Sequence, residues 1–472
     1  MTKQQVGELT FIGATRQVTG SCYLLKTTDS NILLECGMYQ GGYQAERQNR
    51  EAFPFKISQL DVVVISHTHL DHCGLLPKLV KEGYRGPIYM TIATYDLISV
   101  MLTDAAHIEL KDIEWENKQR LRAGKSLIEP IYTQEDVEQT LQQCVPIRYT
   151  EETAICPDVR LTYHEAGHIL GSAVVELKIQ KKNTSRTLVF SGDLGNSNAA
   201  LLRDPAVLSH ADVLLLESTY GDRNHISMPA TIDEFRQALD EAADSNGNVL
   251  IPSFAVGRTQ EVLYWLGKFY RDGTLKQKQV FLDSPMAIAA SDIYFQHLHL
   301  FNKEDEAAFR KVVKSSWHEW LPILKCTLTP EESMQINTIS GGAIIIAGSG
   351  MCSGGRIRHH LKNNLWKRST HLIIVGFQAE GTLGRAIVDG AQSVMVFRNE
   401  TVVNASVHTL GGFSAHADQS QLLQWAGHFK DSNPELYLVH GELDKMLELQ
   451  RAFHDRHQWY ANIPKPGQTI SF

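Results

Sequence analysis

The stretch Ile65-Ser66-His67-Thr68-His69-Leu70-Asp71-His72-Cys73-Gly74 decides the fold that we expect for this chain. It follows an apolar run at 62–65, which predicts a buried strand, and it precedes residues 75–80, which predict the start of a helix. The stretch therefore lies on a strand-to-helix loop at the carboxyl end of a strand. Open α/β sheets place their functional sites at such loops.

The same stretch holds three histidines and one aspartate within six residues, and imidazole and carboxylate are ligands for zinc and similar ions. His67 and His69 can hold one ion, while Asp71 and His72 can reach a second, about 3.5–4 Å away in two-metal sites. A polar loop with accidental histidines is the alternative, and four ligand-type residues in this register argue against it. Structural zinc sites favour cysteine in closed sets, so we predict a catalytic metal site.

Length and composition describe a globular protein without a basic surplus. The 472 residues predict two or three domains, and the formal charge is −8 with a pI of about 6.2. This balance argues mildly against a non-specific nucleic-acid coat protein. A local basic groove or bound metal ions can still supply positive charge.

The cysteine pattern and the apolar runs bear on the compartment. The seven cysteines show no C-x-x-C pair and no regular spacing, which indicates reduced thiols in a cytoplasmic protein rather than a disulfide framework. Residues 1–5 have no apolar signal core. No run of about 18 apolar residues occurs, so we expect no membrane span and no membrane partner.

The pattern of strands and helices divides the chain. The first 200 residues predict mostly short strands closed by helices. From about residue 212, buried strands alternate with helices, which predicts a parallel α/β layer; there, Thr231-x-x-Glu234 has the form of a capping box at a helix start. From about residue 390 short strands return, and no flexible linker separates these parts. We therefore expect the second domain to be inserted into the first.

Three further motifs carry ligand-type residues. His168 lies in a glycine-flanked turn, Asp193 follows a buried strand, and His416 precedes a helix. Each is weak alone, because a lone histidine is more often a structural hydrogen bonder and an aspartate after a strand is often a turn residue. Together with residues 67–72 they complete a set of ligands for two metal ions.

A glycine-rich loop at 348–355 follows a predicted strand and precedes a helix. Successive backbone N–H groups and a helix N-terminus bind anions. An ordinary strand-to-helix loop explains the sequence equally well. The candidate phosphate contacts are Ser349, Gly350, Ser353 and Gly354, with Arg258 at another helix start as a weaker one.

The series His67-Thr68-His69-Leu70-Asp71-His72, then His168, then Asp193, resembles the ligand series of the metallo-β-lactamase fold. Four longer motifs resemble the β-CASP family, which holds nucleases such as the endonuclease subunit of the eukaryotic mRNA 3′-end cleavage machinery and its bacterial and archaeal relatives. These motifs are Glu217-Ser218-Thr219-Tyr220-Gly221, Ile251-Pro252-Ser253-Phe254-Ala255-Val256-Gly257-Arg258, Gly348-Ser349-Gly350-Met351-Cys352-Ser353-Gly354-Gly355 and Phe413-Ser414-Ala415-His416-Ala417-Asp418. The similarity extends to Val439-His440-Gly441-Glu442, nearly the whole chain.

The resemblance implies an αββα metallo-β-lactamase sandwich with an inserted α/β β-CASP domain. The expected domains are 1–217 for the first part of the sandwich, 218–388 for the insert, and 389–472 for the C-terminal part with an RNA-metabolising motif. The resemblance also implies two zinc ions with Asp193 bridging them. His67, His69 and His168 would hold the first ion, and Asp71, His72 and His416 the second. Asp71, Glu217 and His416 are the expected catalytic residues.

Two positions depart from the family pattern. Glu35 stands where the family usually has aspartate, so a hydrogen bond that supports a metal ligand is expected to shift. Ala386 stands where we align a histidine of the eukaryotic nuclease that is thought to assist the leaving group. The leaving-group acid is therefore unassigned from the sequence.

The expected function is a zinc-dependent ribonuclease that hydrolyses phosphodiester bonds of single-stranded RNA, as an endonuclease, a 5′-exonuclease or both. Another hydrolase of the same fold, acting on DNA or on a small ester or thioester, is the alternative among enzymes. A non-cleaving RNA-binding subunit is the alternative outside enzymes, and the complete ligand series argues against it. A homodimer is the oligomeric state that the resemblance suggests.

Overall fold

The fold is described from a computed structural model, which describes residues 5–314, 316–376 and 378–472. The chain divides into two compact units. The first unit comprises Met1–Ser197, Asp204–Asn224 and His416–Phe472, and the second comprises Asn198–Arg203 and His225–Ala415. The first unit is thus built from both ends of the chain, and the main part of the second is inserted within it.

Two β-sheets form the centre of the first unit. One has the strand order β21-β1-β2-β3-β4-β5-β6 and the other β20-β11-β10-β9-β8-β7. The strands of the first sheet are β1 (Glu8–Gly13), β2 (Cys22–Lys26), β3 (Asn31–Leu34), β4 (Val62–Val64), β5 (Ile88–Thr91), β6 (Cys144–Ile147) and β21 (Thr469–Ser471). Those of the second sheet are β7 (Thr153–Cys156), β8 (Val159–Glu165), β9 (Ala173–Lys181), β10 (Thr184–Phe190), β11 (Val213–Glu217) and β20 (Glu435–Val439).

The inner faces of these sheets pack on each other through alternate apolar side chains. Tyr23 of the first sheet meets Phe190 of the second with ring centroids 5.4 Å apart, inside one continuous buried cluster. Fully burying an apolar side chain of this size contributes about 1.5–3 kcal/mol. The alternation of buried and exposed residues along strands such as β1 therefore determines which face of each sheet turns inward.

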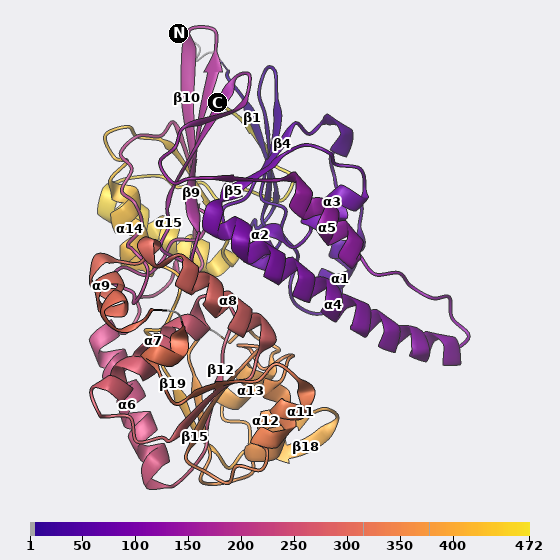
Figure 1. Cartoon of the computed structure of the whole chain (residues 1–472). Helices are drawn as coiled ribbons and strands as arrows, with labels where there is room; N and C mark the ends of the chain where they lie inside the picture. Colours follow the sequence, from indigo (N-terminus) through magenta and orange to yellow (C-terminus); the bar gives the residue numbers. More distant parts are fainter. Residues whose placement is uncertain (1–4, 315, 377) are drawn as a thin grey trace. The chain divides into compact units, whose positions relative to one another are not determined.

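Helices cover both outer faces. The outer face of the first sheet packs against α3, α4 and α5, and that of the second against α14 and α15. The helices of this unit are α1 (Tyr43–Arg50), α2 (Leu70–Cys73), α3 (Leu76–Lys81), α4 (Ile92–Arg122), α5 (Gln134–Gln143), α14 (Gln419–Gly427) and α15 (Leu443–His457). Figure 1 shows α4 as one long helix that follows β5. This layering confirms the predicted αββα sandwich.

The second unit is an α/β layer around a parallel sheet with the order β14-β13-β15-β12-β16-β19. Its strands are β12 (Val249–Pro252), β13 (Gln279–Leu282), β14 (Leu324–Cys326), β15 (Ala343–Ala347), β16 (His371–Ile374) and β19 (Ser406–Thr409), with a hairpin of β17 (Ser393–Val396) and β18 (Asn399–Val402). Its helices are α6 (Met228–Asp244), α7 (Arg258–Arg271), α8 (Pro285–Gln296), α9 (Lys303–Val312), α10 (Trp317–Trp320), α11 (Pro330–Ile336), α12 (Ile357–Asn364) and α13 (Leu383–Val388).

The second unit extends beyond the predicted end of the insert. The sequence placed that end at residue 388, whereas the compact unit continues to Ala415. The reason is a strand pairing: β19 extends the parallel sheet along β16, with His371 opposite Ser406 and Ile374 opposite Thr409. The hairpin of β17 and β18 also packs on this unit, through Val394 and Val396 in its hydrophobic core.

The predicted start of α6 was wrong. The helix begins at Met228 after Ser227, and Thr231 is buried inside it. Pro229 occupies the first turn, where the missing N–H of proline costs nothing. The proline therefore allows the helix to start one turn before the apparent capping box.

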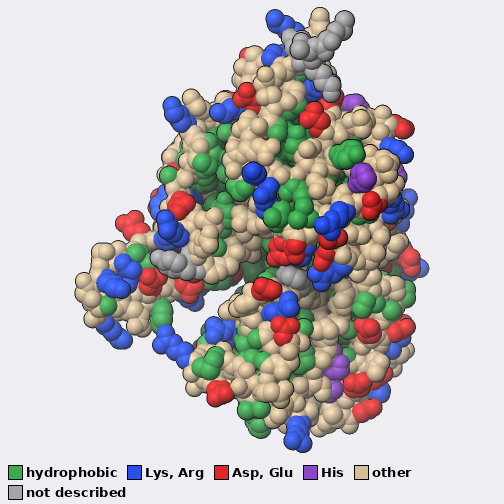
Figure 2. Space-filling model, turned by 180° about the vertical axis from the view of Figure 1, so that it is seen from behind, with side chains coloured by type: hydrophobic (Ala, Val, Ile, Leu, Met, Phe, Trp, Pro, Cys, Tyr) green, Lys and Arg blue, Asp and Glu red, His purple; other side chains and the backbone are tan. Residues whose placement is uncertain are grey.

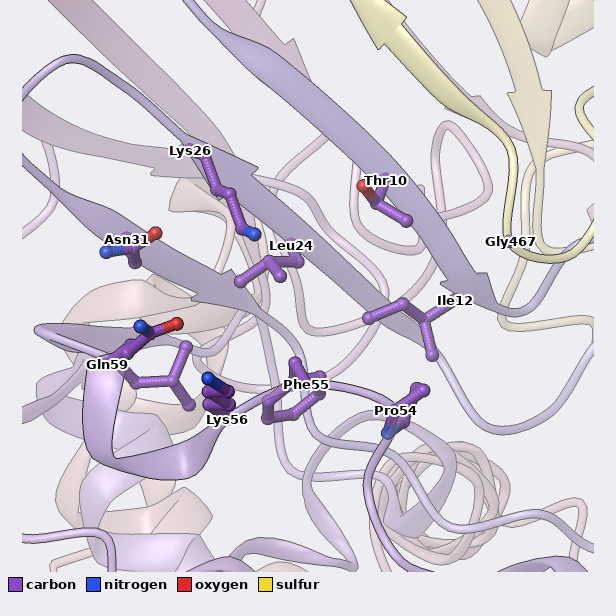
Figure 3. Close-up of a pocket in the computed structure, with 11 residues that line it drawn as sticks. Thr10, Ile12, Leu24, Lys26, Asn31, Pro54, Phe55, Lys56, Gln59 and Gly467 are labelled. Carbon is purple, nitrogen blue, oxygen red and sulfur yellow. The ribbon is translucent and has the colours of Figure 1, made fainter.

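A pocket of about 570 Å³ lies on β1, β2 and β3 (Figure 3). Thr10 and Ile12 of β1 and Lys26 of β2 line it, with Phe55 and Lys56 from the segment before β4. None of the lining residues belongs to the histidine and aspartate motifs, so this pocket does not mark the metal site.

The hydropathy of the helices and the distribution of charge on the surface bear on binding to membranes and to nucleic acid. Among the described residues, none of the helices combines the length and apolar character that a membrane crossing requires. On the face drawn in Figure 2, Lys and Arg side chains are interspersed with Asp and Glu rather than gathered in one patch.

Candidate metal centre

The segment after β4 carries the central motif, with a helix that begins at Leu70, earlier than the sequence predicted, and close backbone packing fixes its path. His67 and His69 lie on the loop, and Asp71 and His72 lie on the short helix α2. The backbone N–H groups of Ser21 and Cys36 donate to the carbonyl oxygens of Asp71 and His72, at 2.8 Å each. A Cβ at Gly37 would stand 1.7 Å from the Asp71 carbonyl oxygen, so only glycine permits this approach.

The remaining candidates lie in loops at the same ends of the strands. His168 follows β8, Asp193 follows β10, Glu217 ends β11, and His440 follows β20. His416 precedes α14. All of these residues, like the central motif, belong to the first unit. The two sheets of the first unit therefore gather side chains that are up to 373 residues apart in sequence.

The first donor set consists of His67, His69, His168 and Asp193. His69 Nδ1 lies 3.2 Å from His67 Nε2 and 3.1 Å from His168 Nε2. Asp193 Oδ2 lies 3.5 Å from His67 Nε2 and 3.6 Å from His168 Nε2. One ligand atom of each of these four residues thus lies within 4.8 Å of the others, and their binding of the first ion stays a prediction.

The second donor set consists of Asp71, His72, His440 and Asp193. His72 Nε2 lies 3.2 Å from His440 Nε2 and 3.3 Å from Asp193 Oδ2. Asp71 Oδ2 lies 3.5 Å from His440 Nε2 and 4.0 Å from His72 Nε2. Asp193 Oδ2 therefore lies within 3.6 Å of histidine nitrogens of both sets, and its bridging of two ions stays a prediction.

The structure places His440 where the sequence analysis had placed His416. The signal for His440 was available, because the histidine directly follows the buried strand β20 in Val439-His440-Gly441-Glu442. The tertiary contact with His72, 368 residues away, is what distinguishes it from an ordinary turn residue.

The donor spacing fits zinc ions. Zinc bonds histidine nitrogen at about 2.0–2.1 Å in tetrahedral sites, which makes the distance between two ligand atoms about 3.3–3.4 Å. The distances within the two sets cluster around this value. In addition, the buried Asp193 Oδ1 accepts no hydrogen bond from the described residues, and its contact there is His440 Nδ1 at 3.3 Å.

Metal binding requires neutral imidazole and ionised carboxylate, and His72 is the donor that departs from this: burial alone would lower its pKa, but the Asp193 and Glu35 carboxylates outweigh burial and raise that pKa well above its ordinary value. Burial lowers the pKa of His67 well below its ordinary value and that of His69 to about 4. Burial alone would raise the pKa of Asp71, but a hydrogen bond with His440 and the electrostatic interaction with His72 lower it to about 2. The same histidines, His440 first, hold the pKa of Asp193 well below its usual range despite its burial.

Glu35 orients one histidine of each set. Its Oε2 accepts a hydrogen bond from His72 Nδ1 at 2.5 Å, which leaves His72 Nε2 to face the second set. Ser66 Oγ donates to the same carboxylate at 3.0 Å and lies 3.0 Å from His67 Nδ1. Ser66 Oγ therefore accepts the His67 Nδ1 proton and leaves Nε2 for the first set. Carboxylates in this position fix the tautomer and raise the basicity of a ligating histidine.

Substitution of Glu35 by glutamine should lower zinc affinity by about 10–100-fold, the usual cost of losing such a partner. The amide cannot accept hydrogen bonds at both of its terminal atoms. Competition with a chromophoric chelator measures the affinity, and Glu46→Gln on the exposed surface of α1 is the matched control. An affinity equal to that of the control would show that Glu35 does not tune the histidines.

The buried Glu217 and the partly exposed His416 form a pair beside Asp193. His416 Nδ1 lies 3.2 Å from Glu217 Oε1 and 3.9 Å from Asp193 Oδ2. Burial alone would lower the pKa of His416, but the Glu217 and Asp193 carboxylates outweigh it and raise that pKa to about 9. His416 is therefore an imidazolium at neutral pH, held next to the donor sets.

This pair bears on the alignment of Ala386 with a family histidine. Ala386 lies on α13 and packs against the hydrophobic core of the second unit. Residue 386 therefore contributes to packing of the second unit. His416 is the histidine that lies next to an acidic residue, Glu217, and next to the donor sets. The alanine therefore leaves the metal centre unchanged.

The predicted phosphate contacts lie in the second unit. The loop at 348–355 joins β15 to α12, and most of its hydrogen bonds are internal: Ser349 Oγ accepts from the Gly354 N–H at 3.0 Å. Ser353 is exposed, and a Cβ at Gly354 would meet nothing within 4 Å. Arg258 is 5% exposed, forms a buried ion pair with Glu261, and lies over the Phe413 ring. Its guanidinium is therefore already engaged inside the unit.

Comparison with protein families gives three matches in chain order. A metallo-beta-lactamase superfamily domain matches residues 24–217, a Beta-Casp domain matches residues 259–387, and a Zn-dependent metallo-hydrolase RNA specificity domain matches residues 400–464.

Individual proteins match over most of the chain. Ribonuclease TTHA0252 of Thermus thermophilus is 40% identical, covering 93% of this chain and 94% of the relative. Transcription termination factor FttA of Methanocaldococcus jannaschii is 33% identical, covering 93% of this chain and 68% of the relative. A crystal structure of a protein of unknown function from Enterococcus faecalis V583 shares the fold, with a TM-score of 0.55, 10% identity, and coverage of 99% of this chain and 100% of that chain.

Proposed function

The chain belongs to the β-CASP family of metallo-β-lactamase-fold nucleases, and from this we propose that it is a zinc-dependent ribonuclease that hydrolyses phosphodiester bonds of single-stranded RNA. The observation that carries the proposal is the pair of donor sets joined by Asp193 Oδ2, with the His416–Glu217 pair beside them. Phosphodiester hydrolysis needs a nucleophile, charge neutralisation and a proton for the leaving oxygen, and these parts can supply all three.

We assign one zinc ion to each donor set. His67, His69 and His168 would hold the first, and Asp71, His72 and His440 would hold the second, with Asp193 common to both. Two zinc ions would supply a hydroxide nucleophile at neutral pH and neutralise the charge of the phosphate. Asp71 suits a second role, because its side chain is 19% exposed while that of Asp193 is 2% exposed. The Asp71 carboxylate can therefore accept a hydrogen bond from the attacking water and orient it.

His416 is our candidate for the general acid. Its Nδ1 is held by Glu217, so we assign the transferable proton to Nε2. Its side chain is 20% exposed, whereas that of Glu217 is fully buried. Glu217 thus acts by positioning and charging the histidine, and His416 delivers the proton to the leaving oxygen. General acids of this kind contribute about 10²–10⁴-fold to the rate.

RNA as the substrate rests on the family and on the relatives. One relative is named a ribonuclease, another a transcription termination factor, and residues 400–464 match an RNA specificity domain. Ser349, Gly350, Ser353 and Gly354 are our candidates for phosphate contacts. The completeness of both donor sets speaks against a non-cleaving subunit, which would be expected to lose ligands.

Cleavage of a single-stranded RNA labelled at either end tests the proposal. The zinc-loaded protein should cleave it, and Asp71→Asn should lose at least about 100-fold in rate because both a ligand and the orienting carboxylate are lost. Internal fragments indicate an endonuclease, and stepwise release from the 5′ end indicates an exonuclease. The exposed Asp29→Asn is the control.

A matching DNA substrate and a thioester substrate identify the alternatives. Protein with two bound metals that leaves the RNA intact but cleaves one of these substrates would overturn the proposal. The same metal-loaded protein binding RNA without cleaving any substrate would point to a binding subunit.

We place the reaction in the cytoplasm, since all seven cysteines are free thiols, as expected in a reducing compartment. The homodimer stays a prediction, and sedimentation velocity of the metal-loaded protein measures it directly.

A further inference from the structure

A group of metal-ligand side chains in the second unit lies outside the machinery described above. It comprises Glu241 on α6, His371 on β16 and His408 on β19, and one potential ligand atom of each residue lies within 4.8 Å of the others. We propose that these three residues form an additional zinc-binding site.

The sheet brings the two histidines together. In the parallel pairing of β16 and β19, His371 is opposite Ser406 and Ile373 is opposite His408. The two histidines are therefore diagonal neighbours on one face of the sheet. His371 Nδ1 lies 2.9 Å from His408 Nε2, and the rings are nearly parallel. The helix α6 packs against β16 and supplies Glu241 from its last turn.

Hydrogen bonds around His371 leave its Nδ1 atom free of a proton and able to bind a metal ion. Ser245 Oγ donates to the Ala242 carbonyl oxygen at 3.0 Å and lies 3.2 Å from His371 Nε2. The hydroxyl proton is used by the carbonyl, so Ser245 Oγ accepts the Nε2 proton of His371. This leaves the Nδ1 lone pair directed toward His408. Metal-ligating histidines usually donate their other ring N–H to such a partner.

The charges favour a cation at this place. Burial and the neighbouring ring lower the pKa of His371, and burial lowers that of His408, so both are neutral ligands at neutral pH. Glu241 contributes a negative charge, and among the described residues it forms no ion pair with Lys or Arg. Its carboxylate also lies at the C-terminal turn of α6, where the helix dipole favours positive charge. Histidine and carboxylate ligands with partial exposure suit zinc in a three-residue site completed by water.

An ion at this place would connect α6 to the edge strand β19 and to the neighbouring strand β16. His371 is 5% exposed, whereas Glu241 is exposed, so the ion would enter from the Glu241 side. The site lies wholly within the second unit and is therefore expected to stabilise this unit without supplying any catalytic group.

Zinc content after gel filtration, measured by mass spectrometry, tests the proposal. His408→Asn and Glu241→Gln should each bind one equivalent less than the wild-type protein, or bind it at least 10-fold more weakly in competition with a chelator. The control His210→Asn replaces a histidine whose side chain is 65% exposed and should keep the wild-type content. RNA cleavage by all three variants should equal that of the wild type.

The deciding quantity is the difference of one zinc equivalent between the wild type and the variants, and it does not depend on how much zinc the catalytic centre holds. The test of this site is therefore independent of the test of the proposed nuclease activity. Equal zinc content and equal affinity in the wild type and both variants would overturn the proposal. The two histidines would then form only a hydrogen-bonded pair. Glu241→Gln changes an exposed residue, so its result stands even if His408→Asn fails to fold.

Discussion

Replacement of His440 by alanine should remove one of two catalytic zinc equivalents and lower kcat for RNA cleavage by more than about 100-fold. Loss of a residue that only hydrogen-bonds a metal ligand already costs up to about 100-fold, and loss of the ligand itself should cost more. His440 Nε2 lies 3.2 Å from His72 Nε2 and 3.5 Å from Asp71 Oδ2. Without it the second donor set keeps only one imidazole. Zinc content and kcat measured on the same preparation check this expectation.

The control for this change is His454→Ala, which removes an exposed histidine from the following helix α15 and should leave zinc content and kcat unchanged. A His440→Ala protein that retains both equivalents and full activity would restore His416 as the ligand of the second ion. Adding zinc in excess separates weakened binding, which recovers activity, from loss of the site, which does not.

Replacement of His416 by asparagine should lower kcat by about 10²–10⁴-fold, the usual contribution of a general acid, while both catalytic zinc ions stay bound. His416 Nδ1 lies 3.9 Å from Asp193 Oδ2 and 3.2 Å from Glu217 Oε1, and its ring packs against that of His168 with centroids 4.4 Å apart. The contrast between the two variants is the test: His440→Ala loses metal, and His416→Asn loses rate alone. Loss of a zinc equivalent in His416→Asn would contradict this division of roles.

The pH profile gives a second readout for the same pair. The pKa of His416 is raised to about 9, so the acid form is present below that pH, and kcat should fall as the pH rises through it. Glu217→Gln removes the first of the carboxylates that raise this pKa, and the alkaline limb should therefore move to lower pH. An unchanged alkaline limb in Glu217→Gln would show that another group donates the proton.

Local pattern was enough to predict most of the fold. The apolar run before His67, the alternation along β1 and the alternating strands and helices after residue 212 are short-range signals, and the structure contains the elements they predict. The end of the insert was harder to predict from the sequence, because β19 joins the second unit through pairing with β16, 35 residues earlier. The start of α6 depended on Pro229, which competed with the apparent capping box at Thr231.

The sequence by itself determined the kind of chemistry, since His67, His69, Asp71 and His72 lie within six residues and their spacing alone implies a metal site. Only the tertiary structure decided which distant histidine completes the second donor set. His416 and His440 both lie in loops at strand or helix ends, and both look equivalent in sequence. The parallel pairing of β20 with β11 brings His440 to His72 and leaves His416 beside Glu217. Ligand identity therefore depends on contacts across hundreds of residues, which no local pattern encodes.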